Sequence, residues 1–403
     1  MARNCRSFDC VDSGTVSMSE CLVVGGGVVG LSIAYELAGR GRRVRVIDAA
    51  QPGREASWAG AGILPPAGSH SDEPLEQLAA LSNRLHAQWW EHLRDDTGID
   101  NGFRRSGAIY LARSATEARA LQTLASVAHR RHIVVEPLSQ ESLREIEPAV
   151  RPRGGLEAAY YAPTECQIRN PRHLKALLVG CAQRGVEVLP GTPAEDFEIR
   201  DGRIEVVVTP AGRLSADTVC ITTGAWSGAL ARKLGLTLEI KPIRGQILLL
   251  SQPRPVLSHI INESSRYLVP RPDGRVLVGS TEDDVGFDRS TTAQGAGDLL
   301  HFALGLVPEL GNSQLERSWA GLRPATVDGM PYLGRVPSLD NAFIAAGHFR
   351  GGLQLSTGTA VVMSQLIDGE TPEVDLSVFR VDRLSHDSPA PQASKTRPAV
   401  SLG

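Results

Sequence analysis

Three glycines near the start of the chain, Gly25, Gly27 and Gly30, have the G-x-G-x-x-G spacing of a dinucleotide-binding turn. An apolar run precedes them and an amphipathic segment, 31–40, follows, which predicts a strand, a turn and a helix whose N-terminus would bind a pyrophosphate. Asp48 ends the next apolar run, at the distance where an acid accepts hydrogen bonds from ribose hydroxyls. These features predict a dinucleotide site, although NAD and FAD share the spacing.

Three later segments combine glycine with small residues. In residues 57–64 the side chains are small enough for backbone amides to lie against a planar ligand, although a tightly packed turn would have the same composition. Residues 218–227 read as a strand that ends in a glycine turn, and 345–352 end in a glycine pair that opens a helix over 353–366. The N-terminus of that helix would suit an electron-rich group such as the N1–C2=O edge of a reduced flavin.

The most specific pattern runs from Trp319 to Gly334 and contains Trp-Ala-Gly-Leu-Arg-Pro followed by Asp-Gly-Met-Pro-Tyr-Leu-Gly. Together with the Gly-His-Phe-Arg-Gly segment at 347–351, it resembles the signatures of the FAD-dependent D-amino-acid oxidase superfamily, and within it those of the glycine oxidases of bacterial thiazole synthesis. The resemblance covers the chain from about Glu20 to Arg383. It implies an α/β protein (α+β overall) with a Rossmann-like FAD-binding domain and an antiparallel-sheet substrate domain.

The resemblance also implies roles for individual residues. Arg323 would hold the substrate carboxylate through two parallel hydrogen bonds, which only a planar guanidinium provides. Tyr267 would donate to the same carboxylate, and Arg350 would lie at the flavin edge beside that pair. A salt bridge for Arg323 and a core position for Tyr267 are the structural alternatives. The predicted catalytic residues are therefore Tyr267, Arg323 and Arg350. The predicted FAD-binding residues are Gly25, Gly27, Val28, Val29, Gly30, Asp48, Ser57, Gly60, Ala61, Gly62, Ile63, Ala194, Thr223, Gly224, Trp226, His348, Arg350, Gly351, Gly352 and Leu353.

The implied activity is oxidation of glycine or a small amine, such as sarcosine or D-alanine, by non-covalently bound FAD. A hydride from the substrate Cα would move to flavin N5, the imino acid would hydrolyse to an oxo acid and ammonia, and molecular oxygen would give hydrogen peroxide. Glu282 could approach the substrate amine, although an acid in an acidic turn is more often simply solvated. His348 could be catalytic, although a structural hydrogen bond is favoured beside the flavin motif. The alternatives are a D-amino-acid dehydrogenase with another acceptor, a sarcosine oxidase with covalent flavin, and a flavin-binding protein without turnover.

Composition and charge argue against several kinds of partner. A net charge of −3 gives no sign of nucleic acid or an anionic membrane, and no apolar run has the length of a transmembrane helix. The six cysteines lack a C-x-x-C pair and the histidines lack metal-ligand spacing, so we expect free thiols and no metal. Without a signal-peptide core, a cytoplasmic location is expected. A homo-oligomer and a thiazole synthase that consumes the product are open possibilities.

The periodicity of apolar residues predicts the elements that must position these groups. The expected helices are 31–40, 75–93, 116–131, 171–184 and 353–366. The expected strands are 196–200 and 204–209, joined as a hairpin at Gly202, and 218–223, 240–250, 267–270, 276–280 and 343–346. The strand at 240–250 is too long for a buried parallel strand, which indicates an antiparallel sheet in a second domain.

A length of 403 residues favours two domains, and the elements of both alternate along the chain, so each domain is expected to be discontinuous. The expected FAD-binding domain comprises 20–85, 150–235 and 320–383, and the expected substrate domain comprises 86–149 and 236–319. Residues 1–19, with Met18 as a candidate start, are expected to be a disordered extension, and 384–403 a disordered tail.

Overall fold

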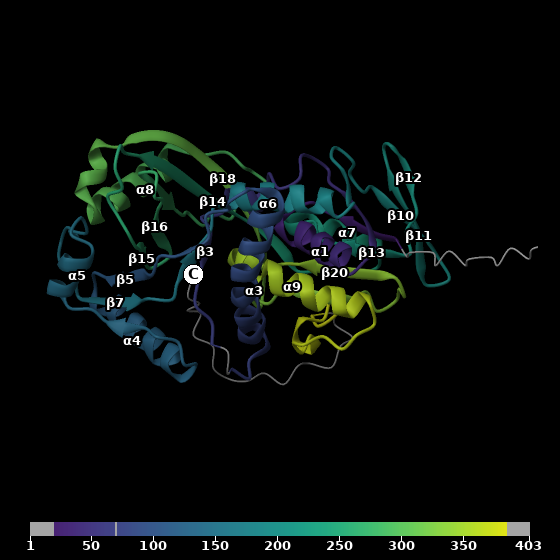
Figure 1. The fold of residues 1–403 in the computed structure, drawn as a ribbon, viewed down its shortest axis with the longest axis horizontal. Coiled ribbons are helices and arrows are strands. Elements are labelled where there is room, and N and C mark those ends of the chain that lie inside the picture. Colours follow the sequence, from purple (N-terminus) through teal and green to yellow (C-terminus); the bar gives the residue numbers. More distant parts are fainter. Residues whose placement is uncertain (1–19, 69–70, 385–403) are drawn as a thin grey trace, which may run out of the picture.

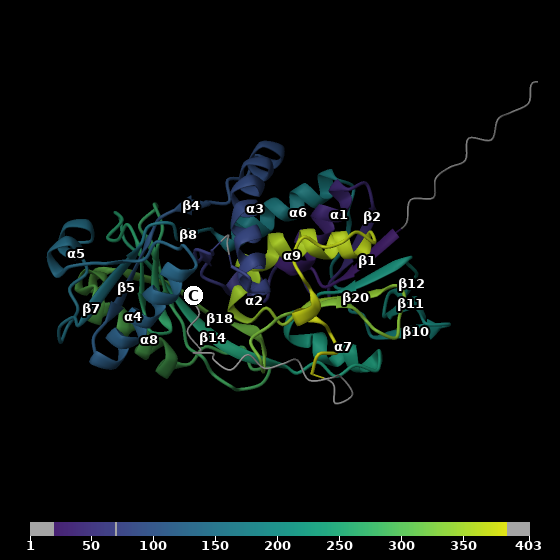
Figure 2. The ribbon, with the colours of Figure 1, turned by 90° about the horizontal axis from the view of Figure 1, so that it is seen from below.

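The computed structural model describes residues 20–68 and 71–384. The extension expected at 1–19, with Met18, and all but the first residue of the tail expected at 384–403 lie outside the described residues. Two large sheets lie at opposite ends of the molecule, and helices cover the sheet that contains the N-terminal strand (Figure 1). The same division is visible from below (Figure 2).

The first large sheet has six strands, and its centre is the apolar strand that precedes the glycine turn. In spatial order the strands are β19 (Tyr332–Arg335), β20 (Ala342–Ala346), β13 (Thr218–Ile221), β1 (Glu20–Val24), β2 (Arg43–Ile47) and β9 (Glu187–Leu189). All neighbours pair in parallel except β19 with β20. Val24 lies opposite both Ile47 and Ile221, so the carboxyl ends of β1, β2 and β13 meet at one edge, where open α/β sheets bind their ligands.

Both faces of this sheet are covered, because successive residues of β1 point to opposite sides. Cys21 and Val23 belong to a core cluster with the helices of one face, whereas Leu22 and Val24 belong to a cluster on the other face. The helices on the first face are α1 (Val28–Gly39), α3 (Pro74–Thr97), α6 (Asn170–Gln183) and α9 (Gly352–Ile367). The second face is covered by α7 (Ser227–Lys233) and by a small sheet of β10 (Asp196–Arg200), β11 (Arg203–Thr209) and β12 (Gly212–Leu214).

The second large sheet has eight strands and is antiparallel except where β15 pairs with β5. In spatial order the strands are β18 (Gln314–Thr326), β14 (Ile240–Ser251), β17 (Arg275–Gly279), β16 (Arg266–Pro270), β15 (Ile260–Glu263), β5 (Ala108–Ala112), β7 (Ala158–Ala162) and β6 (Glu136–Pro137). The long strand expected at 240–250 is confirmed as β14, and its antiparallel pairing with β18 and β17 is as predicted. In Figure 1, β14 and β18 extend from this sheet toward the six-stranded one.

The remaining elements are short or lie at the edges. The helices that pack on the eight-stranded sheet are α4 (Ala115–Arg130), α5 (Gln140–Ile146) and α8 (Ala293–Leu306). A three-stranded sheet of β3 (Ile63–Leu64), β8 (Cys166–Gln167) and β4 (Arg104–Arg105) lies between the large ones (Figure 2). The short helices are α2 (Ala56–Ala59), η1 (Gly224–Trp226), η2 (Pro308–Asn312), η3 (Phe349–Gly351) and η4 (Ser377–Phe379).

The structure differs from the expected division at three places. The boundary at 85/86 falls inside α3, because Leu78, Leu81, Trp89 and Leu93 form one buried stripe along a continuous helix. The boundary at 319/320 falls inside β18, and β7, expected in the cofactor domain, pairs in the eight-stranded sheet. Elsewhere the ends of elements shift by a few residues; α1, for example, begins at Val28 rather than at Leu31.

Candidate active site

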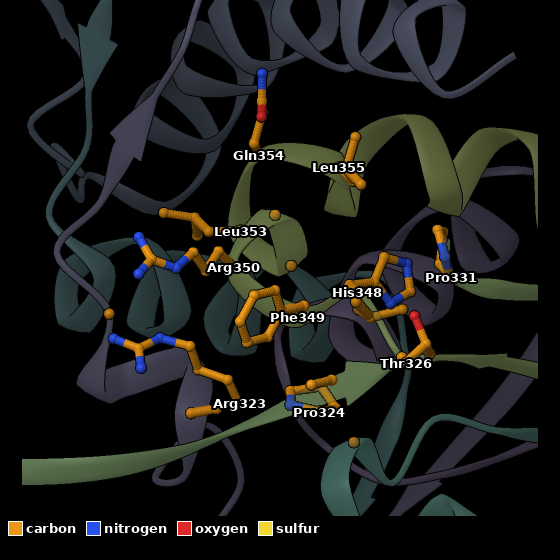
Figure 3. Close-up of a pocket in the computed structure, with 18 of the residues that line it drawn as sticks. Arg323, Pro324, Thr326, Pro331, His348, Phe349, Arg350, Leu353, Gln354 and Leu355 are labelled. Atoms are coloured by element: carbon orange, nitrogen blue, oxygen red, sulfur yellow. The ribbon is translucent and has the colours of Figure 1, made fainter. Parts of the chain in front are cut away.

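One large cavity, about 2970 Å³ in volume, joins the two large sheets. It is lined by the glycine turn after β1, by residues from 57–64 (the small-residue segment, which includes most of α2), by the end of β18 and by the start of α9. Figure 3 shows part of it, with Arg323 and Arg350 extending toward the same side of the pocket. All of the predicted site residues except Gly30 line this cavity, so the fold brings together residues that are far apart in the sequence.

The glycine turn has the shape that a pyrophosphate needs. A Cβ on Gly30 would lie 1.9 Å from the carbonyl oxygen of Gly25, and Gly25 has a φ of +113°, so neither position accepts a side chain. A Cβ on Gly27 would meet only the Ser57 hydroxyl at 3.3 Å, because this glycine faces the cavity. The N-cap residue of α1 is Gly27, which has no side chain, and the first turn contains no acidic residue. The amide of Val28 donates to the Ser57 hydroxyl at 2.9 Å, so the group that meets this positive helix end is neutral and the positive potential at the cavity is retained for an anion.

Asp48 follows β2 at the same edge of the sheet and is held by the backbone. Its carboxylate accepts from the amides of Gly26, at 2.7 Å, and Ala50, at 2.8 Å. Each carboxylate oxygen keeps further acceptor capacity, as binding of ribose hydroxyls requires. Ala194 and Thr223 line the same cavity, on segments that follow β9 and β13. These residues fit the adenosine half of a dinucleotide.

The small-residue segment is tightly packed behind and open to the cavity in front. The indole N–H of Trp319 donates to the carbonyl of Ala59 at 2.9 Å, and a Cβ on Gly321 would lie 2.5 Å from the Cβ of Ala59. A Cβ on Gly62 would lie 1.9 Å from the carbonyl oxygen of Ile168. These contacts are those of a tightly packed turn, and the segment also lines the cavity. Its contact with a ligand stays a prediction.

The start of α9 is a second helix end at the cavity, and its N-cap residue supplies no side-chain cap. Its N-cap is Gly351, which has no side chain, and its first turn contains no acidic residue. His348 precedes it and is buried, with Nε2 3.1 Å from the hydroxyl of Thr359. Burial lowers the pKa of His348 to about 4, so the imidazole is neutral near pH 7. The interpretation of His348 as a structural histidine agrees with this contact.

Arg323 lies on β18 and extends into the cavity. Its guanidinium donates to the hydroxyl of Ser280 at 2.6 Å and to the carbonyl of Thr281 at 3.2 Å, both neutral oxygens. Among the described residues, no carboxylate forms an ion pair with it. Burial lowers its pKa below the ordinary value, and an arginine retains its charge nonetheless. The cavity therefore contains a fixed cation whose charge is left for an anionic ligand.

A comparison with Arg271 shows why position matters as well as burial. Arg271 is 5% exposed and donates to the side chain of Gln167 at 2.6 Å and to the carbonyl of Ala61 at 2.7 Å. It does not line the cavity, so its hydrogen bonds serve to hold the small-residue segment. Arg323 differs because its guanidinium faces the open space.

Tyr267 and Arg350 surround the same part of the cavity. Tyr267 lies opposite Gly279 in the sheet, and a Cβ on Gly279 would lie 2.4 Å from its ring, so this glycine makes room for the aromatic side chain. The Tyr267 side chain is close enough to Arg323 to raise its pKa. Arg350 donates through Nε to Glu282 at 2.8 Å. The side chain of Glu282, interpreted as a solvated acid, is 38% exposed and forms an ion pair with Arg350.

Several residues of the site escaped the sequence analysis. Ser280 and Thr281 accept from two donors of Arg323, and only their place at the end of the predicted strand 276–280 and directly after it could have indicated this. Gly245 interrupts the long strand β14, and a glycine inside a strand often marks a close approach. Here a Cβ on Gly245 would lie 2.2 Å from both terminal nitrogens of Arg323.

A glycine turn at the carboxyl edge of a parallel sheet, open to one large cavity, is the arrangement of an enzyme that uses a dinucleotide cofactor. The chain belongs to the family described as FAD dependent oxidoreductase, which matches residues 20–366. The cofactor is therefore FAD, and the glycine turn, Asp48 and the small-residue segment have the geometry to hold it.

Known proteins with similar sequences and structures span nearly the whole chain. Glycine oxidase of Pseudomonas aeruginosa is 36% identical over 363 residues, which cover 89% of this chain and 97% of that protein. The bifunctional protein ThiO/ThiG of Synechocystis sp. is 31% identical over 360 residues, 87% of this chain and 51% of that protein. The crystal structure of glycine oxidase from Geobacillus kaustophilus has a TM-score of 0.86 and 34% identity, and the match covers 91% of this chain and 99% of that one.

Among residues 20–68 and 71–384, no helix has both the length and the apolar character needed to cross a bilayer. In the same ranges, no group of three or more histidine, cysteine or acidic side chains is arranged to hold a metal ion. Cys21, Cys166, Cys181 and Cys220 are free thiols, whereas Cys5 and Cys10 lie outside the described part.

Proposed function

We propose that this protein oxidises glycine or a small amine, such as sarcosine or D-alanine, to the imino acid, with oxygen as the electron acceptor. The imino acid either hydrolyses to an oxo acid and ammonia or is consumed by a partner enzyme, and the oxygen is reduced to hydrogen peroxide. The observation that carries the proposal is the unpaired charge of Arg323 inside the cavity, since an amino-acid carboxylate is the anion that a cation in this place would bind. The similarity to glycine oxidases over 89% of the chain supports the same substrate class.

Arg323 and Tyr267 would bind and orient the substrate. The guanidinium would make two parallel hydrogen bonds to the carboxylate, and the tyrosine hydroxyl would add a directional donor without another charge. Arg350 would supply a second positive charge next to them, partly balanced by Glu282. A substrate held at one end by these donors presents its Cα–H in one orientation, which is the main contribution a protein makes in such a reaction.

The FAD-binding residues predicted from the sequence are proposed to hold the cofactor along the cavity, without a covalent bond. Bound flavin supplies the redox chemistry, since it accepts a hydride and passes electrons to oxygen. The uncapped N-terminus of α9, at Gly351 and Gly352, would stabilise negative charge that develops beside it. The N-terminus of α1, which has no acidic residue in its first turn, would do the same for the pyrophosphate.

The site does not require a dedicated general base. His348 is neutral and bonded to Thr359, and Glu282 is engaged with Arg350, so neither is free to take a proton from the amine. The substrate would therefore bind as the free amine, which has lost its proton to water. This assignment predicts faster turnover as the pH rises toward the pKa of the substrate ammonium group.

The place of the reaction in metabolism is part of the proposal. A relative that matches 87% of this chain is one half of a bifunctional protein named ThiO/ThiG, which supports delivery of the imino acid to a thiazole synthase in thiamine biosynthesis. The expected cytoplasmic location and a homo-oligomeric state stay predictions. Cell fractionation would test the first, and light scattering of the purified protein the second.

An anaerobic titration of the purified yellow protein with glycine tests the proposed reaction. We expect the flavin absorbance to bleach, to recover when air is admitted, and to leave hydrogen peroxide. Bleaching by D-alanine but not by glycine would move the substrate to larger D-amino acids. Bleaching that does not recover in air would indicate a dehydrogenase with another acceptor. A spectrum that no amine changes would overturn the proposal.

A further inference from the structure

The segment Ser280–Asp283 supplies the acceptors for both site arginines. Ser280 Oγ and the carbonyl of Thr281 accept from Arg323, and the carboxylate of Glu282 accepts from Arg350. Three successive residues thus determine where two guanidinium groups lie. The segment follows the end of β17 and is not itself part of a strand. Its backbone contacts β14 at Asp283 and where the Thr281 amide donates to the Gln246 carbonyl at 3.4 Å, and side chains supply further contacts.

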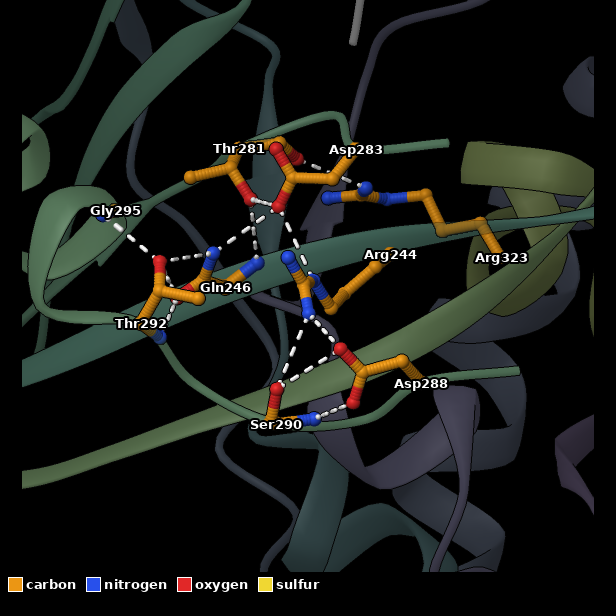
Figure 4. A network of polar contacts seen from close by, with 9 residues as sticks. All are labelled: Arg244, Gln246, Thr281, Asp283, Asp288, Ser290, Thr292, Gly295 and Arg323. Carbon is orange, nitrogen blue, oxygen red and sulfur yellow. Dashed lines mark hydrogen bonds and ion pairs between the residues drawn. The ribbon is translucent and has the colours of Figure 1, made fainter. Parts of the chain in front are cut away.

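Asp283 is the centre of the contacts that hold this segment (Figure 4). One of its carboxylate oxygens, Oδ2, accepts from the Thr281 hydroxyl at 2.9 Å, from the Gln246 amide at 3.0 Å and from Nε of Arg244 at 3.2 Å. Burial raises the pKa of Asp283, but the hydrogen bonds from Gln246, Thr281 and Arg244 outweigh it and leave the pKa below its ordinary value. The carboxylate is therefore ionised near pH 7.

The backbone of Asp283 pairs with Arg244, whereas its side chain bonds to Thr281. The amides and carbonyls of Asp283 and Arg244 form a reciprocal pair at 2.9 Å, which ties residue 283 to β14. The side chain reaches back two residues to Thr281, whose carbonyl points to Arg323. The carboxylate thus sets the conformation of the turn between the anchored residue and the acceptors.

Because side chains alternate along a strand, one face of β14 contacts Asp283 and the other faces Arg323. Arg244 and Gln246 point to the face that contacts Asp283 and are 5% and 2% exposed. Gly245, between them, points to the other face, where the guanidinium of Arg323 occupies the space a side chain would fill. The strand therefore anchors the acceptor segment with one face and accommodates the cation with the other.

We propose that Asp283 is a positioning residue for substrate binding: through Thr281 and Arg244 it holds the acceptors that place Arg323 and Arg350 at the carboxylate of the substrate. The inference rests on the proposed function, because it assigns that carboxylate to these arginines. It adds a residue that touches neither substrate nor flavin. Misplacing a donor by about 1 Å weakens an oriented contact far more than it weakens the fold.

Asp288 offers a matched control within the same network. It also pairs with Arg244, Nη1 to Oδ2 at 2.5 Å, and with Ser290, but it has no hydrogen bond to Thr281 or Gln246. Loss of Asp288 removes charge and a contact to Arg244 and leaves the acceptor segment with its own anchors. A difference between the two variants therefore reports the positioning role and not the loss of an ion pair.

The experiment uses FAD-loaded full-length protein with Asp283→Ala, Asp283→Asn or Asp288→Ala. Glycolate, a carboxylate without an amine, is titrated while the flavin absorbance is followed, and kcat and KM for glycine and the melting temperature are measured on the same samples. For Asp283→Ala we expect the Kd of glycolate and the KM to rise about tenfold or more with a smaller change in kcat. For Asp283→Asn, whose amide oxygen still accepts these donors, and for Asp288→Ala, we expect changes within about threefold.

The proposal is overturned if Asp283→Ala binds glycolate like the wild type, or if Asp288→Ala weakens binding as much. If Asp283→Ala does not fold, Thr281→Val decides the matter: it keeps the carbonyl that Arg323 uses but loses the hydroxyl that Asp283 holds, and an unchanged Kd would overturn the inference. Failure of the proposed function looks different, because then the wild type itself would neither bind glycolate nor be bleached by glycine.

Discussion

Substitution of Arg323 should weaken substrate binding more directly than any other proposed change. Arg323→Ala removes the cation that faces the cavity, so we expect FAD to stay bound and the KM for glycine to rise. Loss of an oriented charged pair costs about 3–5 kcal/mol when its partner stays buried, which corresponds to roughly 10²–10⁴-fold. Steady-state kinetics measure the effect, and the flavin-to-protein absorbance ratio shows whether the cofactor is retained.

Arg323→Lys is the informative companion to this variant. Lysine keeps the charge but cannot make two parallel hydrogen bonds, so its KM should lie between those of the wild type and the alanine variant. A near-normal KM for Arg323→Ala would contradict the assignment of this arginine to the carboxylate.

Glu165 is a residue outside the proposed chemistry whose titration should be visible in stability. It is fully buried, accepts from the hydroxyl of Tyr110 at 2.6 Å, and burial raises its pKa from 4.5 to about 7. The folded state thus binds this proton more tightly than the unfolded state. Stability should therefore fall as the pH rises from about 4.5 to about 7, by up to roughly 3 kcal/mol.

Glu165→Gln tests this linkage, because glutamine keeps the shape and cannot ionise. We expect its melting temperature to depend less on pH than that of the wild type between about pH 5 and about pH 8, with the variant relatively more stable at the alkaline end. Parallel curves for the two proteins would mean that Glu165 is not the group responsible.

At the scale of elements, β14 must leave space for the cation that β18 carries. In Gly245→Ala the new Cβ would lie 2.2 Å from the guanidinium nitrogens, so Arg323 must move. We expect the KM for glycine to rise by about tenfold to a hundredfold, with FAD still bound. Gly297→Ala, on α8 with nothing within 4 Å of the new Cβ, is the control and should bind glycine normally.

The start of α1 is the element on which cofactor binding depends. Gly27→Val places a side chain toward the cavity where only the Ser57 hydroxyl lies nearby, so the protein should fold but purify without yellow colour. Circular dichroism checks the fold and visible absorbance checks the flavin. A fully yellow Gly27→Val would show that the pyrophosphate lies elsewhere. Gly30→Val, by contrast, should fail to fold, because its Cβ would lie 1.9 Å from a backbone oxygen.

At the scale of the whole molecule, the cavity joins the two large sheets, so the cofactor should stabilise the folded protein as a whole. Free FAD at 100 times its Kd would add about 2.7 kcal/mol to the free energy of unfolding. We expect the melting temperature of the apoprotein to rise when FAD is added, as calorimetry would measure. FMN, which lacks the adenosine half, should raise it less. An identical response to both would contradict a site at Asp48 and Ala194.

What the sequence alone determined is local in origin. Glycine spacing, apolar periodicity and the segment around Arg323 specified the turn after β1, the long antiparallel strand β14 and the family, because backbone freedom and side-chain alternation act over a few residues. The tertiary structure decided what depends on distant neighbours. It showed that α3 is one helix through residue 85 and that Glu282 meets Arg350. It also showed that Asp283 accepts from the hydroxyl of Thr281, whose carbonyl accepts from Arg323, and that Gly245 makes room for the Arg323 guanidinium. These contacts join segments tens to hundreds of residues apart, and no local pattern encodes which of them will meet.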